Sequence, residues 1–136
     1  MLIADLDLRT ANGVITPGEH ESRDKEEEND VSLSPEDSTI YRSIAARANY
    51  LAADRPGLMY AVKELCRGMA APTRGHWLKL KRLGRCLVEN GRTVLRYKWQ
   101  GHEHEVTGYS DSDWAGCRKT GRSTSGGSHH DRRSLY

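Results

Sequence analysis

Two carboxylates, Asp111 and Asp113, stand where a strand-like run, residues 106–110, ends in a turn that closes at Gly116. A carboxylate at a strand end is a frequent anchor for a divalent ion, because Mg²⁺ takes one or two carboxylates together with substrate phosphates. The pattern predicts a site for metal-dependent phosphoryl chemistry. The alternative is that both side chains act as turn residues and accept local backbone N–H bonds. We favour this alternative for the chain as it stands.

The set of potential metal ligands is incomplete. Two-metal hydrolysis of a phosphodiester needs further carboxylates to hold both ions. After Asp113 the sequence contains one more acid, Asp131, so we expect no hydrolysis by this chain. The six histidines and three cysteines show no zinc-site spacing. Cys66, Cys86 and Cys117 are therefore predicted to be free thiols in a reducing compartment.

A basic segment after Thr73 offers a second candidate site. It alternates apolar residues with the cations Lys79, Lys81, Arg82 and Arg85. On one face of a helix such cations attract phosphate oxygens without reading bases. We therefore predict weak, sequence-independent nucleic-acid binding. An ordinary amphipathic helix with solvated charges is the alternative.

Charge is unevenly distributed along the 136 residues, although the net charge is only +2. The first 40 residues contain eleven acidic and three basic residues, and the rest of the chain is basic. Residues 1–33 are predicted to be a disordered acidic linker, because they bury too little apolar surface to offset ordering. No apolar stretch is long enough to span a membrane, and the first residues do not resemble a signal peptide. We expect an intracellular chain, in cytoplasm or nucleus, without membrane or small-molecule partners.

Residues 34–91 predict three helices. Their starts are marked by Ser34 with Pro35, by Pro56 and by Thr73. Apolar residues three or four positions apart give each helix one inward stripe. The stripes are Ile40, Tyr41, Ile44, Ala48 and Leu51; Leu58, Ala61, Val62, Leu65 and Met69; and Trp77, Leu80, Leu83, Leu87 and Val88.

Residues 94–99 and 106–111 predict two strands, joined by a turn that begins at Gly101, in an antiparallel hairpin. Gly126 and its neighbour are expected in a flexible turn, and residues 128–136 in polar coil. The predicted fold class is α+β, with a three-helix segment followed by a β-hairpin.

Several short motifs occur together in one order. They are Tyr41 to Ile44 with Asn49 to Leu51; Arg55 to Val62; His76-Trp77 with Leu80 to Leu83; Gly108 to Gly116; and Arg122 to Gly127. The ordered set resembles the polyproteins of copia-type long-terminal-repeat retrotransposons, over roughly residues 13–127.

The resemblance implies a domain organisation. Residues 1–33 correspond to a variable linker and residues 34–91 to connection or thumb-like helices of a reverse transcriptase. Residues 92–127 correspond to the first hairpin of an incomplete ribonuclease H-like fold. Residues 128–136 depart from the family, as expected of a truncated fragment.

It also implies function. The family carries out RNA-directed DNA synthesis and removes RNA from RNA–DNA hybrids with Mg²⁺. Asp111 matches its first metal-binding aspartate, and nucleic acid is the implied partner. We expect this chain to be inactive, because the family's later carboxylates have no counterpart. The alternatives are a noncatalytic helical module that binds nucleic acid and a protein-interaction fragment.

Overall fold

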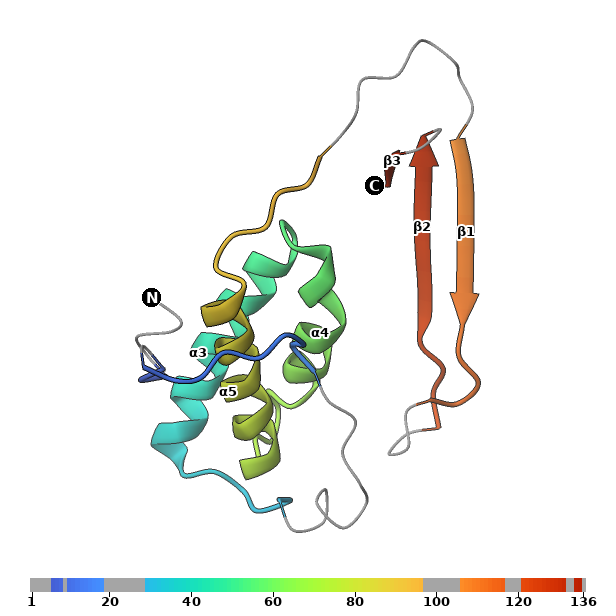
Figure 1. The fold of residues 1–136 in the computed structure, drawn as a ribbon. Helices are drawn as coiled ribbons and strands as arrows, with labels where there is room; N and C mark the ends of the chain where they lie inside the picture. The colour runs from blue at the N-terminus through green and yellow to red at the C-terminus, as the bar shows by residue number, and fades with distance from the viewer. Residues whose placement is uncertain are drawn as a thin grey trace. The chain divides into compact units, whose positions relative to one another are not determined.

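The computed structural model describes residues 6–8, 10–18, 29–96, 106–116, 121–131 and 134–135. The chain divides into two compact units, residues 1–93 and residues 94–136 (Figure 1). Among the described residues, the first unit contains three α-helices, and the second contains a small antiparallel sheet. This mixture is compatible with the predicted α+β class. Within the described part of the chain, no helix has the length and apolarity needed to cross a membrane.

Helix α3, Pro35–Ala52, begins where the sequence predicts. The Ser34 hydroxyl accepts the Asp37 backbone N–H at 3.0 Å and so satisfies one free donor of the first turn. The buried face consists of Ser38, Tyr41, Ile44, Ala45, Ala48 and Ala52. The buried face differs from the predicted stripe at its two ends: Ile40 is exposed, and Leu51 is half-buried. The helix thus turns Ala45, Ala48 and Ala52 toward its neighbours.

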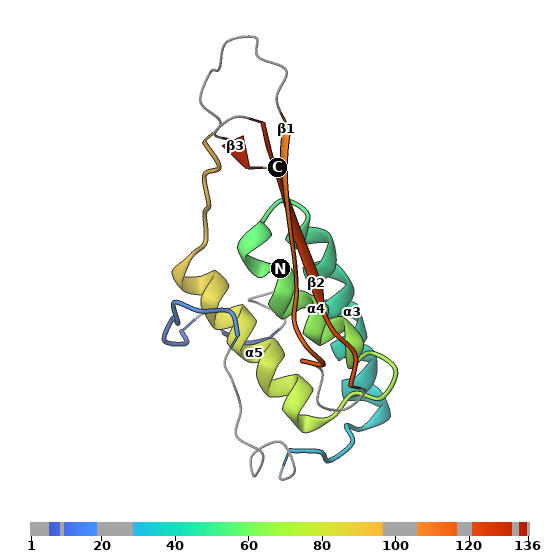
Figure 2. The same ribbon diagram turned by 90° about the vertical axis from the view of Figure 1, so that its right-hand side faces the viewer.

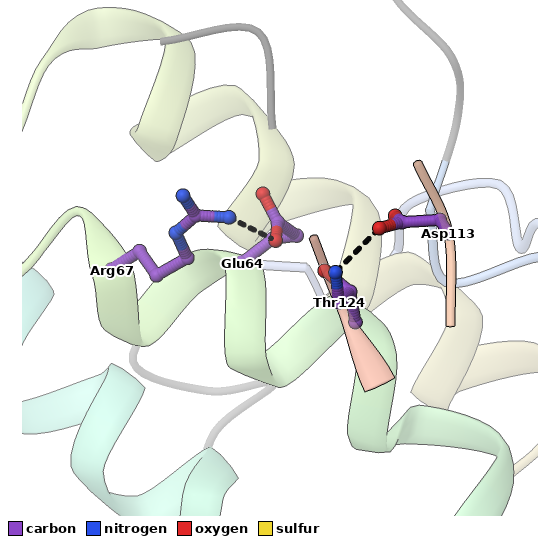
Figure 3. A network of polar contacts seen from close by, with 4 residues as sticks. All are labelled: Glu64, Arg67, Asp113 and Thr124. Carbon is purple, nitrogen blue, oxygen red and sulfur yellow. Dashed lines mark hydrogen bonds and ion pairs between the residues drawn. The ribbon is translucent and has the colours of Figure 1, made fainter. Parts of the chain in front are cut away.

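The second predicted helix is present in two parts. A 3-10 turn, η1 (Pro56–Leu58), leads into α4, Met59–Arg67. Leu58, Val62 and Leu65 are the buried residues of this stretch. On the outer surface, Arg67 Nη1 lies 3.1 Å from Glu64 Oε1 (Figure 3). An exposed pair one turn apart contributes little to stability.

Helix α5, Arg74–Glu89, is capped by Thr73. The Thr73 backbone N–H donates to His76 Nδ1 at 3.1 Å, as in a capping box. The Arg74 backbone N–H donates to the Val31 carbonyl at 2.8 Å. Backbone N–H donors at the start of α5 are thus satisfied by the His76 side chain and by the Val31 carbonyl, which lies in the segment that precedes α3. The buried residues of α5 are Gly75, Leu80, Leu83, Gly84, Cys86 and Leu87.

The three helices share one apolar core. Its most completely enclosed side chains are Tyr41, Ile44, Val62, Leu65, Leu80 and Leu83. Tyr41 donates its hydroxyl to the Leu65 carbonyl at 2.7 Å. Burial raises the pKa of the Tyr41 phenol far above its usual range, and the Cys66 thiol beside it raises this pKa further. Trp77, predicted inside, is only half-buried and packs at the edge of the core.

The N-terminal strap, defined as the described residues between Leu6 and Gly18, lies across the C-terminal half of α5 (Figures 1 and 2). Leu6 and Leu8 are 6% and 8% exposed and belong to the helical core. Gly84 makes room for them, because a Cβ there would lie 2.5 Å from Leu8 Cδ1.

The prediction of a disordered linker is therefore wrong for these residues. Leu6 and Leu8 find their apolar partners on α5, far along the chain, and burying a leucine side chain stabilises by about 1.5–3 kcal/mol. Local composition does not register such a contact. Residues 19–28, the most acidic part of the predicted linker, lie outside the described residues.

The second unit contains an antiparallel sheet of order β1-β2-β3. Its strands are β1 (Val106–Ser112), β2 (Ser125–Asp131) and β3 (Ser134–Leu135). The register pairs Val106 with Asp131 at one end of the hairpin and Ser112 with Ser125 at the other. Every residue of β1 is exposed. β1 is thus held by its backbone pairing with β2 rather than by a buried face of its own.

The prediction that residues 94–99 form the strand beside β1 fails for the part of it that the structure describes. Residues 94–96 are irregular, and residues 97–99, the rest of that expected strand, lie outside the described residues. The strand that pairs with β1 is β2, although the sequence predicts a flexible turn at Gly126 and polar coil from Ser128. Backbone pairing requires neither apolar alternation nor branched side chains. The polar, glycine-rich composition of β2 therefore gave no sequence signal for a strand.

Candidate functional site

The carboxylate turn, residues 111–116, follows directly from the hairpin. Asp111 is exposed on β1 and stands opposite Gly126 in the register. One of its oxygens, Oδ1, accepts the Ser112 backbone N–H at 2.8 Å. Asp111 therefore serves as an acceptor for its own neighbour.

Asp113 joins the two arms of the loop between β1 and β2. Its backbone N–H donates to the Thr124 carbonyl at 3.0 Å, and its Oδ1 accepts the Thr124 backbone N–H (Figure 3). The Ala115 backbone N–H donates to Ser123 Oγ at 3.1 Å. Gly116 passes so close to the Asp113 carboxylate that a Cβ would collide with it.

These contacts match the turn-residue interpretation of both carboxylates. Sequence reasoning missed Ser123 and Thr124 as partners. Their only signal was that residues 122–127 belong to the same ordered set of motifs.

The described residues do not supply the further carboxylates that a two-metal site at this turn would need. Asp111 and Asp113 each have one oxygen committed to a backbone N–H. Among the described residues, no group of three or more histidine, cysteine, aspartate or glutamate side chains is placed to share a metal. The arrangement supplies a polar, solvent-exposed turn, and we derive no chemical step through a metal.

The basic helix is α5. Of the four cations predicted to bind phosphate, Lys81 is exposed, whereas Lys79, Arg82 and Arg85 are half-buried. Arg74, in the first turn of the helix, is exposed as well. The exposed cations suit a diffuse electrostatic surface, because phosphate attracts them without a shaped pocket.

Two of the four cations contact the N-terminal strap. Arg85 Nε donates to the Asn12 carbonyl at 2.7 Å, and Arg82 Nη2 donates to Thr16 Oγ1 at 3.0 Å. The structure therefore does not leave the four cations as one solvated group. Sequence reasoning missed Asn12 and Thr16, because they lie 73 and 66 residues away from their partners.

Comparison with known proteins finds relatives that include retrovirus-related Pol polyproteins. The chain is 41% identical over 90 residues to a retrovirus-related Pol polyprotein from transposon RE2 of Arabidopsis thaliana. It is 39% identical over 90 residues to the Pol polyprotein from transposon RE1 of the same plant. Each match covers 66% of this chain and 6% of the polyprotein.

An uncharacterized mitochondrial protein of Arabidopsis thaliana is 37% identical over 92 residues, which is 66% of this chain and 37% of that protein. No model of a known protein family matches the chain, and no solved structure gives a significant match.

Two-thirds of the chain is thus homologous to Pol polyproteins of retrotransposons. The chain spans about 6% of the length of the two polyproteins that it matches.

Proposed function

We propose that this fragment derives from a copia-type Pol polyprotein and spans the connection helices of the reverse transcriptase and the opening hairpin of its ribonuclease H domain. The observation that carries the proposal is the sequence of elements. Three helices lead to β1, which carries Asp111 one residue before its end at Ser112, and this strand pairs with β2 in an antiparallel hairpin. The polyprotein's polymerase and hybrid-cleaving activities belong, in this proposal, to the longer protein.

The fragment itself is proposed to be catalytically inactive. Its support is the local engagement of Asp111 and Asp113 by backbone donors. With an RNA–DNA hybrid and either Mg²⁺ or Mn²⁺, we expect no cleavage by the purified chain above background. Asp111→Asn is the matched variant, and it should leave this background unchanged. Cleavage that disappears in Asp111→Asn would show that the chain assembles a working metal site.

We also propose that α5 binds nucleic-acid phosphates weakly and without sequence preference. The support is its row of cations, of which Arg74 and Lys81 are exposed. Each phosphate contact contributes about −0.9 to the slope of log K against log salt on duplex DNA. Changing Lys79, Lys81, Arg82 and Arg85 together to glutamine should therefore flatten that slope by up to about three to four units.

A control variant with the same change in charge tests whether position matters. It replaces four cations of α3 and α4 with glutamine: Arg42, Arg47, Lys63 and Arg67. We expect the control to keep most of the slope, measured by fluorescence anisotropy on a duplex and on a hybrid of equal length. Equal slopes for both variants would rule out α5 as the specific contact.

A protein-interaction fragment is the second candidate, and the exposed sheet favours it. Tyr109 is 61% exposed, and Trp114, in the turn after β1, is 96% exposed. If this candidate is right, the chain should show no salt-dependent affinity for duplex or hybrid. Replacing Tyr109 and Trp114 with serine should then weaken binding to a protein partner without affecting α3, α4 and α5.

A further inference from the structure

The strap and a phosphate backbone require the same guanidinium groups. Arg85 Nε donates to the Asn12 carbonyl at 2.7 Å, and Arg82 Nη2 donates to Thr16 Oγ1 at 3.0 Å. Both acceptors are neutral. Both bonds already have a charged donor, and a phosphate group adds negative charge on the acceptor side and can accept two parallel guanidinium N–H bonds. A phosphate oxygen that reaches these cations therefore offers a better acceptor than the strap does.

Helix geometry places Arg85 in line with the exposed cations. Residues 74, 81 and 85 are seven and four positions apart, so Arg74, Lys81 and Arg85 share one face of α5. Arg74 and Lys81 are exposed, whereas Arg85 is half-buried and contacts the strap. The cationic row thus continues beneath the strap.

The two halves of the strap are held differently. Leu6 and Leu8 are buried in the core beside Gly84 and anchor the first half. The second half, residues 12–16, is held mainly by hydrogen bonds, and its largest apolar side chain, Ile15, is 85% exposed. The Val14 backbone N–H donates to the Arg85 carbonyl at 3.4 Å, a long bond. The second half is therefore the part that can leave while the anchor stays.

We propose that residues 12–16 form an autoinhibitory clasp over the cationic row of α5. A polyanion displaces the clasp, and its phosphate oxygens accept hydrogen bonds from Arg82 and Arg85. Leu6 and Leu8 stay buried in the core. This inference rests on the proposed nucleic-acid binding and adds its regulation. The occupant is recognised by its row of phosphate charges and by no base.

The test compares the full chain with a release variant, Val14→Pro combined with Thr16→Val. These changes remove the Val14 donor and the Thr16 acceptor and leave Arg82, Arg85, Leu6 and Leu8 in place. Ile15→Thr is the matched control in the same segment, because the Ile15 side chain is mostly exposed. Circular dichroism establishes that all three proteins keep their helices.

We expect the release variant to bind a fluorescent DNA duplex about three- to tenfold more tightly than the unchanged chain, since two of the hydrogen bonds that hold the clasp on α5 are gone. Ile15→Thr should bind like the unchanged chain. In NMR titrations with the same duplex, the Arg85 Nε–H and Val14 amide signals of the unchanged chain should shift, while the Leu6 and Leu8 methyl signals stay in place.

The outcomes separate the clasp from the proposed function. If the unchanged chain binds duplex, equal affinity of the release variant with unmoved Val14 and Arg85 signals would overturn the clasp and leave the proposed function standing. If neither protein binds duplex, the proposed function fails, and the clasp fails with it. A shift of the Leu6 and Leu8 methyl signals together with Val14 would contradict the division into anchor and clasp.

Discussion

At the scale of single residues, Tyr41 shows how one polar group is accommodated in an apolar core. Its ring is fully buried, and its hydroxyl donates to the Leu65 carbonyl. That carbonyl also accepts the Gly68 backbone N–H at 3.0 Å, so it keeps a partner if the hydroxyl is lost. Burial raises the pKa of the phenol, which means that the folded chain holds the proton more firmly than the unfolded chain does.

Tyr41→Phe should cost about 1 kcal/mol of unfolding free energy near neutral pH, the contribution of one hydrogen bond. The pKa of Tyr41 is raised in the folded state, so its contribution is complete below the unfolded pKa of about 10 and declines as pH rises above it. Urea titrations between pH 7 and 11 should therefore show a steeper loss of stability in the unchanged chain than in Tyr41→Phe.

Tyr50→Phe is the control for that series, because Tyr50 is 83% exposed. It should match the unchanged chain at every pH. If Tyr41→Phe lost stability with the same pH profile as the unchanged chain, the decrease in unfolding free energy at high pH would come from groups other than Tyr41.

The sequence was sufficient for residues whose partners are close along the chain. Ser34 and Thr73 begin their helices as predicted, because a cap contacts a backbone group only three residues away. Asp113 was recognised as a possible turn residue. Its partner Thr124 was not, because that contact depends on how the loop closes.

At the scale of elements, the contact between the strap and α5 depends on Gly84, because a glycine has no side chain to fill the space that the strap occupies. Glycine in the interior of a helix costs about 1 kcal/mol relative to alanine, so its presence at position 84 requires a compensating gain. That gain is the space that Leu6 and Leu8 occupy.

Gly84→Val should destabilise the first unit by about 1–3 kcal/mol, because the new side chain competes with Leu8 for the same volume. Thermal or urea unfolding followed by circular dichroism measures the effect. In a Leu8→Ala background the same substitution should cost less, since the obstructing side chain has been shortened. Additive costs in this double-mutant cycle would show that Leu8 and position 84 are not in contact.

Elements with internal periodicity were predictable, and elements defined by distant partners were not. The three helices follow from apolar residues at spacings of three and four together with local caps. The strap pairs with a helix more than sixty residues away, and β2 has the composition of a loop. The contact of the strap exists only once α5 has formed, whereas β2 pairs with its neighbour β1 but carries no strand pattern in its residues.

At the scale of the whole molecule, the two units differ in how much apolar surface each encloses. The helices surround a common core, whereas every residue of β1 is exposed. A hairpin without a buried face is marginally stable in water. The units should therefore differ in local stability rather than unfold as one body.

Hydrogen–deuterium exchange should reveal this difference. Amides of Ile44 and Leu80, in the helical core, should exchange only through global or near-global unfolding. Amides of Tyr109 and Gly127, in the hairpin, should exchange within the earliest time points. Equal protection of the two groups would show that the sheet is covered by something that stabilises it.

The strap also has a consequence for the order of events during synthesis. Its hydrogen bonds from Arg82 and Arg85 of α5 span 66 and 73 residues, and Leu6 and Leu8 lie against Gly84 still further along the chain, so the ribosome makes both leucines long before their binding surface exists. Contacts between α3 and α4 join neighbouring segments and can form as each emerges. Closing so long a loop makes docking of the strap a late step in folding. Until α5 has been translated, both leucines remain accessible to chaperones, and a nascent chain stalled before Gly84 keeps them so.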